Sequence, residues 1–246
     1  MTAELAVVAG ASGALGSAIA DALRAAGLHV VAVTRNGGAD DAATTGVAAD
    51  VGTVLGQDAV AATVAELGAP VRMVVQAAGL PRTGPLASID PDALGTTVAL
   101  KVGGLLRLVR AVDDRLRRGE RIVALGGHFG SEPSPDACAA GVTNAALANL
   151  VRQLATAYGP RGITAHLVAP GPVDTPRMRG LAAAAAERRG VDVDEVLAER
   201  AAESPLGRFV APAEVAWTVA TLLAPEADAL HGATLALDAG ARRGLF

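Results

Sequence analysis

Short apolar runs alternate with longer segments of helical character along the whole chain. The runs are mostly uninterrupted by polar residues, which is typical of strands that are buried on both faces. Strands of this kind that alternate with helices favour a parallel sheet covered by helices on its two sides. The apolar runs are residues 3–9, 28–34, 71–76, 121–125, 163–168 and 233–237, and the helical segments are 14–26, 53–67, 90–117, 135–158 and 212–223.

A charged, alanine-rich segment at residues 177–208 breaks this alternation. It contains two predicted helices, one on each side of Gly190. Because it follows the sixth strand of the expected sheet, it would lie over the edge at which α/β folds bind ligands. We interpret it as a substrate lid, with a surface excursion or a subunit contact as the alternative. No linker or repeat interrupts the rest, so we expect a single domain over residues 1–246.

The composition narrows the class of protein. Hydrophobic residues make up 51% of the chain and aromatic residues only 2%, so the core must consist of alanine, valine and leucine. The net charge of −4, without a basic cluster, argues against nucleic acid as a partner. A single cysteine excludes an internal disulfide and argues against a cysteine-based metal site. With no long uncharged apolar segment and no leader-like start, we expect no membrane partner and a cytoplasmic location.

The first apolar run leads into Gly-Ala-Ser-Gly-Ala-Leu-Gly at residues 10–16, and a predicted helix follows. Glycines let the chain turn tightly and approach a pyrophosphate, while a helix N-terminus supplies N–H groups and a positive dipole end. The position between a strand and a helix makes this loop a predicted phosphate cradle rather than an ordinary turn. Its expected cofactor contacts are Gly10, Ser12, Gly13, Leu15 and Gly16.

The end of the second apolar run predicts which dinucleotide binds. The run ends in Val33-Thr34-Arg35, where an acidic residue would bind the 2′-hydroxyl of NAD. Arg35 instead suits the 2′-phosphate of NADP, because a guanidinium forms strong bonds with phosphate oxygens. We therefore expect NADP(H) as the cofactor, with NAD less favoured. The alternative is that Arg35 is only a solvated cation at a strand end.

Several ordered motifs together resemble the short-chain dehydrogenase/reductase superfamily over nearly the whole chain. Residues 9–16 are similar to its TGxxxGxG loop, with Ala9 in place of threonine and Ala14 in place of the middle glycine. The other motifs are Ala49-Asp50-Val51, Gln76-Ala77-Ala78-Gly79, the segment 170–176, Pro205-Leu206-Gly207-Arg208 and Asp238-Ala239-Gly240.

The resemblance implies a fold, an assembly and further cofactor contacts. It implies a three-layer Rossmann fold of the α/β class, with a doubly wound, seven-stranded parallel sheet in the order 3-2-1-4-5-6-7. It also implies homotetramers or homodimers formed through the fourth and fifth helices. The further cofactor contacts that it implies are Asp50, Val51, Ala78, Gly79, Pro170, Gly171, Val173 and Thr175.

The family's catalytic residues are replaced in this chain. The family uses a tyrosine acid/base, a lysine one helical turn later, a serine before them and a supporting asparagine. When Asn144-Ala-Ala-Leu is aligned with the family's Lys-Ala-Ala-Leu, the tyrosine position is Ala140 and the serine position, thirteen residues earlier, is Gly127. The asparagine position is Lys101, the only lysine. The only tyrosine, Tyr158, has no lysine one turn later.

Other side chains are candidates to replace the lost machinery. Lys101 and Asn144 look like an exchange of lysine and asparagine between neighbouring helices, and Lys101 would contact the nicotinamide ribose or an anionic substrate. The alternative is a lysine that extends to solvent. His128, next to the serine position, is a candidate acid/base near neutral pH, unless its role is structural. Asp136 and Cys138 lie near the tyrosine position and could line the cavity.

Three functions remain open at this point. The first is an NADP(H)-dependent oxidoreductase that works through the candidates Lys101, His128 and Asn144. The second is a non-redox isomerase, dehydratase or cyclase in the same pocket. The third is a pseudoenzyme, either a dinucleotide-binding protein or a partner subunit. In each case the small-molecule ligand is not specified, and we expect ordinary ketoreductase activity to be absent or weak.

Overall fold

The computed structural model describes residues 3–38, 40–81 and 84–244, and within them the chain forms a sheet of seven parallel strands. The strand order is β3-β2-β1-β4-β5-β6-β7, which confirms the expected topology. The order reverses between β1 and β4, and this is where such folds bind nucleotides. The strands are β1 Leu5–Ala9, β2 His29–Thr34, β3 Thr44–Ala48, β4 Val71–Gln76, β5 Arg121–Leu125, β6 Thr164–Pro170 and β7 Thr234–Leu237.

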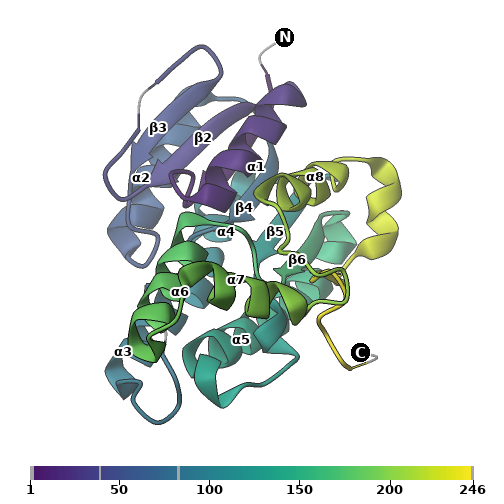
Figure 1. Cartoon of the computed structure of the whole chain (residues 1–246). Coiled ribbons are helices and arrows are strands. Elements are labelled where there is room, and N and C mark those ends of the chain that lie inside the picture. Colours follow the sequence, from purple (N-terminus) through teal and green to yellow (C-terminus); the bar gives the residue numbers. More distant parts are fainter. Residues whose placement is uncertain (1–2, 39, 82–83, 245–246) are drawn as a thin grey trace.

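Helices cover both faces of the sheet and give the expected three layers (Figure 1). On one face, α1 (Ala14–Ala25) and α8 (Pro212–Thr221) lie side by side. On the other face lie α2 (Val54–Leu67), α4 (Gly104–Val112) and α5 (Cys138–Tyr158), and each face has its own buried apolar cluster. The remaining α-helices of the described residues are α3 Pro91–Val98, α6 Pro176–Arg189 and α7 Val193–Ala202.

The strand β3 is absent from the hydrophobic pattern that predicted the other six. Its sequence is Thr-Thr-Gly-Val-Ala, and only Thr44 and Val47 are buried. It lies at the edge of the sheet and pairs with β2 alone, Val47 opposite Val33. A short edge strand with a glycine in its centre has no continuous apolar run, so the pattern gave no signal for it.

The segment 90–117, expected as one helix, is divided into four pieces. After α3 the chain makes a π turn at Ala99–Gly103, continues as α4, and ends in a 3-10 turn at Asp113–Arg115. A π turn widens the helix by one residue and is often found at functional sites. Here it carries Lys101, so the irregular turn lies where the sequence predicted chemistry.

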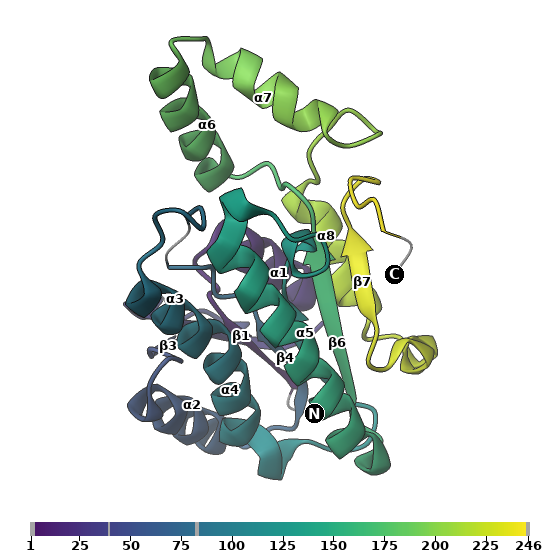
Figure 2. The same cartoon turned by 90° about the horizontal axis from the view of Figure 1, so that it is seen from below.

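The two helices expected on either side of Gly190 are present as α6 and α7. Gly190 ends α6 in the left-handed conformation, with φ of +66°. The pair projects beyond the carboxyl ends of the strands (Figure 2) and packs around a small cluster of its own. At its base, Val210 donates a 2.9 Å hydrogen bond to the Pro172 carbonyl and accepts one from the Asp174 N–H. These bonds join the two ends of the insertion to each other.

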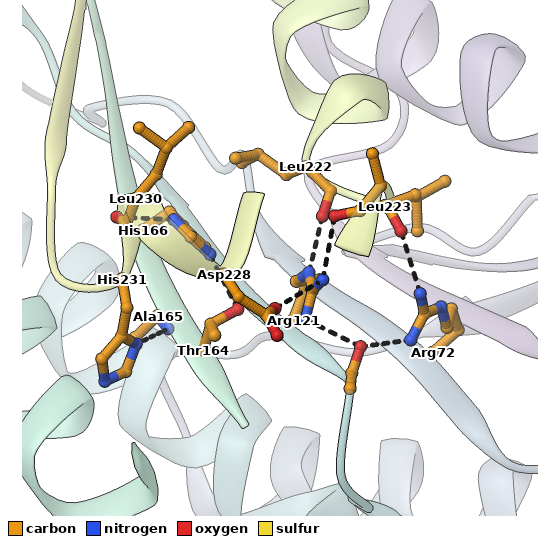
Figure 3. A network of polar contacts seen from close by, with 12 residues as sticks. Arg72, Arg121, Thr164, Ala165, His166, Leu222, Leu223, Asp228, Leu230 and His231 are labelled. Atoms are coloured by element: carbon orange, nitrogen blue, oxygen red, sulfur yellow. Dashed lines mark hydrogen bonds and ion pairs between the residues drawn. The ribbon is translucent and has the colours of Figure 1, made fainter. Parts of the chain in front are cut away.

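A polar network, drawn in Figure 3, fastens the C-terminal segment near the amino ends of β5 and β6, which are the ends opposite to those from which α6 and α7 project. We call it the C-terminal clasp. Arg121, only 1% exposed, donates to the Leu222 carbonyl at 2.6 Å and pairs with Asp228 at 2.9 Å. His166 is fully buried between the Leu230 carbonyl, 3.1 Å from Nδ1, and a threonine hydroxyl. The clasp is therefore structural and lies away from the ligand edge.

Candidate functional site

The glycine-rich loop at the end of β1 is built so tightly that side chains are excluded from two positions. Gly10 has φ of +78°, and a Cβ there would lie 2.7 Å from the backbone of Ala78 in the loop after β4. A Cβ on Gly16, inside α1, would lie 2.0 Å from the Gly10 carbonyl oxygen. No side chain caps α1 at Gly13. The loop thus presents the start of α1 toward the strand-order reversal, which is the arrangement that binds a pyrophosphate.

The ends of β2 and β3 place the other expected nucleotide contacts beside this loop. Arg35 follows β2 and is exposed. The Thr34 carbonyl accepts a 2.8 Å bond from Ala49, which fixes the end of β3 against β2. Asp50 is exposed, and its carboxylate accepts the Gly52 N–H at 2.8 Å, while Val51 is buried. The structure brings Arg35, Asp50 and Val51 to the same edge as the glycine loop.

Gln76, at the end of β4, joins the loop after β4 to the π turn through hydrogen bonds of its side chain. Its side chain is fully buried, and Nε2 donates to the carbonyls of Leu100 and Lys101 at 3.2 Å and 3.4 Å. Its Oε1 accepts the Ala78 N–H at 3.2 Å. A Cβ on Gly104 would lie 2.6 Å from Nε2, so the glycine makes room for this amide. The sequence identified Gln76 only as part of a family motif, and its bonding role was not predicted.

Lys101 is buried, with 5% of its surface exposed, on the π turn that packs against α5. Among the described residues its ammonium has no hydrogen bond or ion pair. Burial lowers the pKa of Lys101 to about 8, and the positive charge of Arg177 lowers it further. Most of the Lys101 side chain is therefore buried.

Asn144 and Gly127 lie in contact, as the family's lysine and serine positions would. A Cβ on Gly127 would lie 2.9 Å from Asn144 Nδ2, so the missing side chain leaves the space that the amide approaches. Asn144 is 4% exposed, and its Oδ1 is buried without a hydrogen-bond partner in the described structure. Ala140 lies one turn earlier on α5, on the same face as Asn144. This group of residues has no hydroxyl and no ionisable side chain.

His128 begins a short 3-10 turn directly after Gly127, with its ring centroid 4.0 Å from that of Phe129. Burial lowers the pKa of His128 below its usual value, and the Asp238 carboxylate and the Pro170 carbonyl oppose this shift in part. The imidazole is therefore neutral at pH 7 and is better suited to accept a proton than to donate one. The other two candidates near the tyrosine position are half-buried Cys138 and exposed Asp136.

The segment after β6 lies against the carboxyl end of β7. The Gly171 N–H donates to the Leu237 carbonyl at 2.9 Å, and a Cβ on Gly171 would lie 2.9 Å from the Asp238 Cα. Val173 is buried, and the Thr175 hydroxyl accepts the Met178 N–H at 3.2 Å as the N-cap of α6. Pro170, Gly171, Val173 and Thr175 thus form the wall between the sheet edge and α6.

Arg177 is a site residue that the sequence did not single out. It lies in the first turn of α6 and donates from Nη1 to the Leu80 carbonyl, 2.8 Å away in the loop after β4. The same nitrogen is 3.7 Å from the position of a Cβ on Gly79. This hydrogen bond joins the insertion to the loop after β4, at the edge of the sheet where the ligand is expected to bind. Its only sequence signal is its place next to the segment 170–176.

Two kinds of site are not found in the described part of the chain. No three histidine, cysteine, aspartate or glutamate side chains gather there as metal ligands would. No helix among those residues combines the length and the apolar character needed to cross a bilayer.

A glycine cradle at the order reversal of a doubly wound parallel sheet defines a dinucleotide-binding α/β protein. A family model described as enoyl-(acyl carrier protein) reductase matches residues 10–242. The chain is 33% identical over 255 residues to the short-chain reductase protein NovJ of Streptomyces niveus, covering 96% of this chain and 93% of that protein. It is 31% identical over 251 residues to cis-4-hydroxycyclohexanecarboxylate dehydrogenase of Sinomonas cyclohexanicum, covering 96% of each. This chain belongs to the short-chain dehydrogenase/reductase superfamily.

Solved structures agree with this assignment. L-sorbose reductase from Gluconobacter frateurii, complexed with NADPH and L-sorbose, superposes with a TM-score of 0.91 at 26% identity, over 99% of this chain and 98% of that one. A single-residue variant of actinorhodin polyketide ketoreductase with NADPH gives a TM-score of 0.87 at 26% identity, over 98% of each chain. The fold is therefore that of enzymes solved with a nicotinamide dinucleotide bound.

Proposed function

We propose that this protein binds NADP(H) in preference to NAD(H) and that its ordinary ketoreductase activity is absent or weak. The observation that carries the proposal is a contrast within one site. The cradle for the dinucleotide keeps the glycines that its geometry requires, whereas the group formed by Gly127, Ala140 and Asn144 has no proton-donating side chain that is acidic enough for the family's reaction.

The residues present fit a nicotinamide dinucleotide. Gly10 and Gly16 stand where a Cβ would collide with backbone, and the uncapped start of α1 offers N–H groups to a pyrophosphate. Arg35 is exposed beside this loop, where it could bind the 2′-phosphate that distinguishes NADP. The NADPH in the two structural relatives supports the same preference. When bound, the reduced nicotinamide supplies a hydride.

A carbonyl that accepts a hydride must also receive a proton, and here the usual donor is missing. Ala140 carries no proton to give, Gly127 has no hydroxyl to polarise the carbonyl, and Asn144 is a neutral amide where the family has a lysine. General acid catalysis contributes about 10²- to 10⁴-fold to a rate. Without this proton donor, the rate of carbonyl reduction should be lower by at least a factor of that size.

Two remaining groups are candidates for contact with the ligand. Lys101 has a pKa of about 8, and no carboxylate among the described residues forms an ion pair with it, so it is suited to contact a ligand oxygen. His128 is neutral because burial lowers its pKa, so it is suited to accept a proton. We propose that Lys101 positions the ligand and that α6 and α7 form a lid over it.

The protein is further proposed to be a cytoplasmic homodimer or homotetramer that assembles through α4 and α5. The outer face of the first turns of α5 supports this assembly because it is small and apolar, with Val142 48% exposed and Ala145 also exposed, whereas Asn149, Arg152 and Gln153 make its later part polar. Light scattering would give the molar mass of the assembly, and a monomeric mass that does not change with concentration would contradict the proposal.

Binding and redox turnover can be measured separately. We expect NADPH, followed by its fluorescence, to bind more tightly than NADH, because only NADPH carries the phosphate that Arg35 can bind. Arg35→Asp should cost NADPH about tenfold to hundredfold in affinity, the value of a charge-assisted hydrogen bond. Arg188→Asp, on the outer part of the insertion, is the matched control and should leave both affinities unchanged. Absence of NADPH binding would contradict the proposal.

The second measurement follows absorbance of the reduced nicotinamide with a panel of ketones, quinones and alcohols. The proposal expects binding with little or no absorbance change. Turnover at a rate ordinary for the family would contradict it, because no residue of the Gly127–Ala140–Asn144 group can supply the proton.

A non-redox reaction in the same pocket is the second candidate function. The observation that favours it is Lys101, whose pKa of about 8 lets it exchange a proton near neutral pH without any dinucleotide. Isomerisation, dehydration or cyclisation that proceeds in the absence of NADP(H) would establish this candidate. Dinucleotide binding without turnover of any ligand would instead support a non-catalytic dinucleotide-binding or partner subunit.

A further inference from the structure

We propose that Gly46 and Thr34 are positioning residues that determine the preference for NADP(H) over NAD(H). They hold the turn that carries Arg35 against the edge strand β3, and so fix where the guanidinium can reach. This inference deepens the proposed function and rests on it in one respect, namely that Arg35 binds the 2′-phosphate of NADP(H). It adds to the cofactor site a glycine in the middle of a strand, which the sequence did not single out.

Arg35 and Asn36 are the two central residues of a tight turn that follows β2, and both are exposed. Thr34 closes this turn, because its hydroxyl donates to the Gly37 carbonyl at 2.6 Å and its carbonyl accepts the Gly37 N–H at 3.5 Å. Among the residues that the structure describes, none forms a hydrogen bond or an ion pair with the Arg35 side chain. The reach of this guanidinium therefore depends on where the backbone of the turn lies.

A close contact between two glycines holds the end of this turn against β3. A Cβ on Gly46 would collide with the Gly38 carbonyl oxygen and would lie 2.9 Å from the Gly38 nitrogen. Nonbonded heavy atoms prefer separations of about 3.5–4.0 Å, so a side chain at position 46 would push Gly38 away from the strand. A glycine inside a strand often marks such a close approach of another backbone.

The rest of the connection between β2 and β3 also lies along the edge strand. The Gly46 N–H donates to Asp40 Oδ1 at 2.7 Å, and the Asp41 N–H donates to the Thr44 carbonyl at 2.9 Å. Both bonds use backbone groups of β3 that would otherwise be free, because this strand pairs with β2 alone. The connection thus covers the edge of the sheet, and its backbone comes closest to β3 at Gly46.

The pyrophosphate cradle is fastened independently of this turn. The Gly10 N–H donates to the Val33 carbonyl at 2.9 Å, which joins the glycine loop to β2. The Ala49 N–H donates to the Thr34 carbonyl at 2.8 Å, which joins the end of β3 to β2. Neither bond involves residues 35–38, so a shift of the turn leaves the cradle in place. Such a shift should weaken the contact with the 2′-phosphate, which only NADP(H) carries, and should affect NAD(H) much less.

The quantity that tests this inference is the dissociation constant of NADH divided by that of NADPH, both followed by the fluorescence of the reduced nicotinamide. We expect Gly46→Ala to lower this ratio by about fivefold or more, because a lost charge-assisted hydrogen bond costs about tenfold or more in affinity. Thr34→Val removes the hydroxyl that donates to Gly37, keeps the shape of the side chain, and should lower the ratio in the same direction.

Two controls separate positioning from a loss of stability. Val47→Ala removes a buried side chain from the same strand and should lower stability, while the ratio stays that of the wild type at matched folded fraction. In an Arg35→Gln background, Gly46→Ala should cost almost no further NADPH affinity, because both substitutions then remove the same contact.

The possible results distinguish this inference from the function on which it rests. A Gly46→Ala variant that keeps the wild-type ratio, or that loses NADPH affinity by the same factor in the Arg35→Gln background, would overturn the inference and leave the proposed preference standing. Where Gly46→Ala does not fold, an unchanged ratio in Thr34→Val overturns it instead. A wild type that binds NADH as tightly as NADPH would contradict the proposed preference itself, and the inference with it.

Discussion

In the absence of a ligand, Lys101 lowers the stability of the folded protein. Its pKa is lowered from 10.5 to about 8 because its charged form has lost water and faces the positive charge of Arg177. Folding favours the neutral form of this lysine. The protein is therefore less stable at every pH at which the lysine of the unfolded chain carries a charge. The cost is complete below pH 8 and disappears as the pH rises from 8 to 10.5. At about 1.36 kcal/mol per pKa unit, the loss of stability amounts to about 3 kcal/mol.

Replacement of Lys101 by methionine should therefore stabilise the protein. We expect the free energy of unfolding of Lys101→Met at pH 7 to exceed that of the wild type by up to about 3 kcal/mol. The gain should shrink as the pH approaches 10.5, where the unfolded wild-type lysine loses its charge as well. Urea unfolding at both pH values measures it, and Lys101→Arg, which keeps the charge, is the control. A destabilised Lys101→Met at pH 7 would show that the ammonium has a structural partner.

The sequence predicted the place of Lys101 but not its surroundings. Its place directly before Val102-Gly103-Gly104, with Arg110-Ala111 following, was enough to align it with the family's asparagine position. The position of Arg177 depends on its hydrogen bond to Leu80, 97 positions away along the chain, which joins the first turn of α6 to the loop after β4. A contact between segments so far apart in the sequence carries no periodic signal, so this bond is visible only in three dimensions.

The elements with continuous apolar runs were predicted nearly to the residue, as β4 and β5 show. These strands are buried on both faces, so their hydrophobicity records their place in the sheet. The strand β3 and the π turn at Ala99–Gly103 were missed for opposite reasons. The first has too few apolar residues for a pattern, and the second keeps the apolar pattern of a helix while its backbone widens by one residue.

The contact between the glycine loop and α1 leads to a prediction about one element. Gly16→Ala should lower NADPH affinity at least tenfold, because the new Cβ would lie 2.0 Å from the Gly10 carbonyl oxygen and the cradle would have to open. Asp21→Ala is the control on the same helix, because Asp21 is exposed and lies outside the glycine loop. Fluorescence titration with NADPH compares the two, and equal affinities would refute the role of the close contact.

The C-terminal clasp couples the fold to pH through His166 and the neighbouring Glu120. Burial lowers the pKa of His166 from 6.5 to about 4, so its contribution to stability is complete above pH 6.5 and is lost as the pH falls toward 4. Burial raises the pKa of Glu120 from 4.5 to about 7, so its contribution is complete below pH 4.5 and is lost as the pH rises toward 7. In the wild type the two effects oppose each other between these limits.

Removal of the Glu120 carboxyl group should make the effect of His166 on the pH dependence of stability measurable. We expect the free energy of unfolding of Glu120→Gln to rise by about 2 kcal/mol between pH 5 and pH 6.5, from His166 alone, at about 1.36 kcal/mol per unit. The double variant Glu120→Gln with His166→Gln should lose this rise. Urea unfolding across this range measures both, and a Glu120→Gln profile as flat as that of the wild type would contradict the assignment of His166.

In the whole molecule, the residues proposed to bind ligands lie apart from the residues that stabilise the fold. The clasp (Figure 3) lies near the amino ends of β5 and β6. The helix α6, which begins with Arg177, projects beyond the carboxyl ends of the strands (Figure 2), and the Lys101 carbonyl bonds to Gln76 at the carboxyl end of β4. Substitutions at Gly127 and Ala140 therefore alter chemistry without touching the residues that carry the fold. This separation is consistent with the proposal that the chain keeps the family's architecture without its usual proton donor.

The most direct test restores what the account says is missing. The triple variant Gly127→Ser, Ala140→Tyr and Asn144→Lys rebuilds the family's serine, tyrosine and lysine, and the exchange of Asn144 also removes the Nδ2 atom that lies 2.9 Å from the position of a Cβ on residue 127. NADPH oxidation is measured with a ketone panel, for wild type and variant at matched folded fraction. We predict a gain of about 10²-fold or more over the wild type, the contribution of a general acid. A wild type that reduces the same ketones as fast as the triple variant would contradict the central claim.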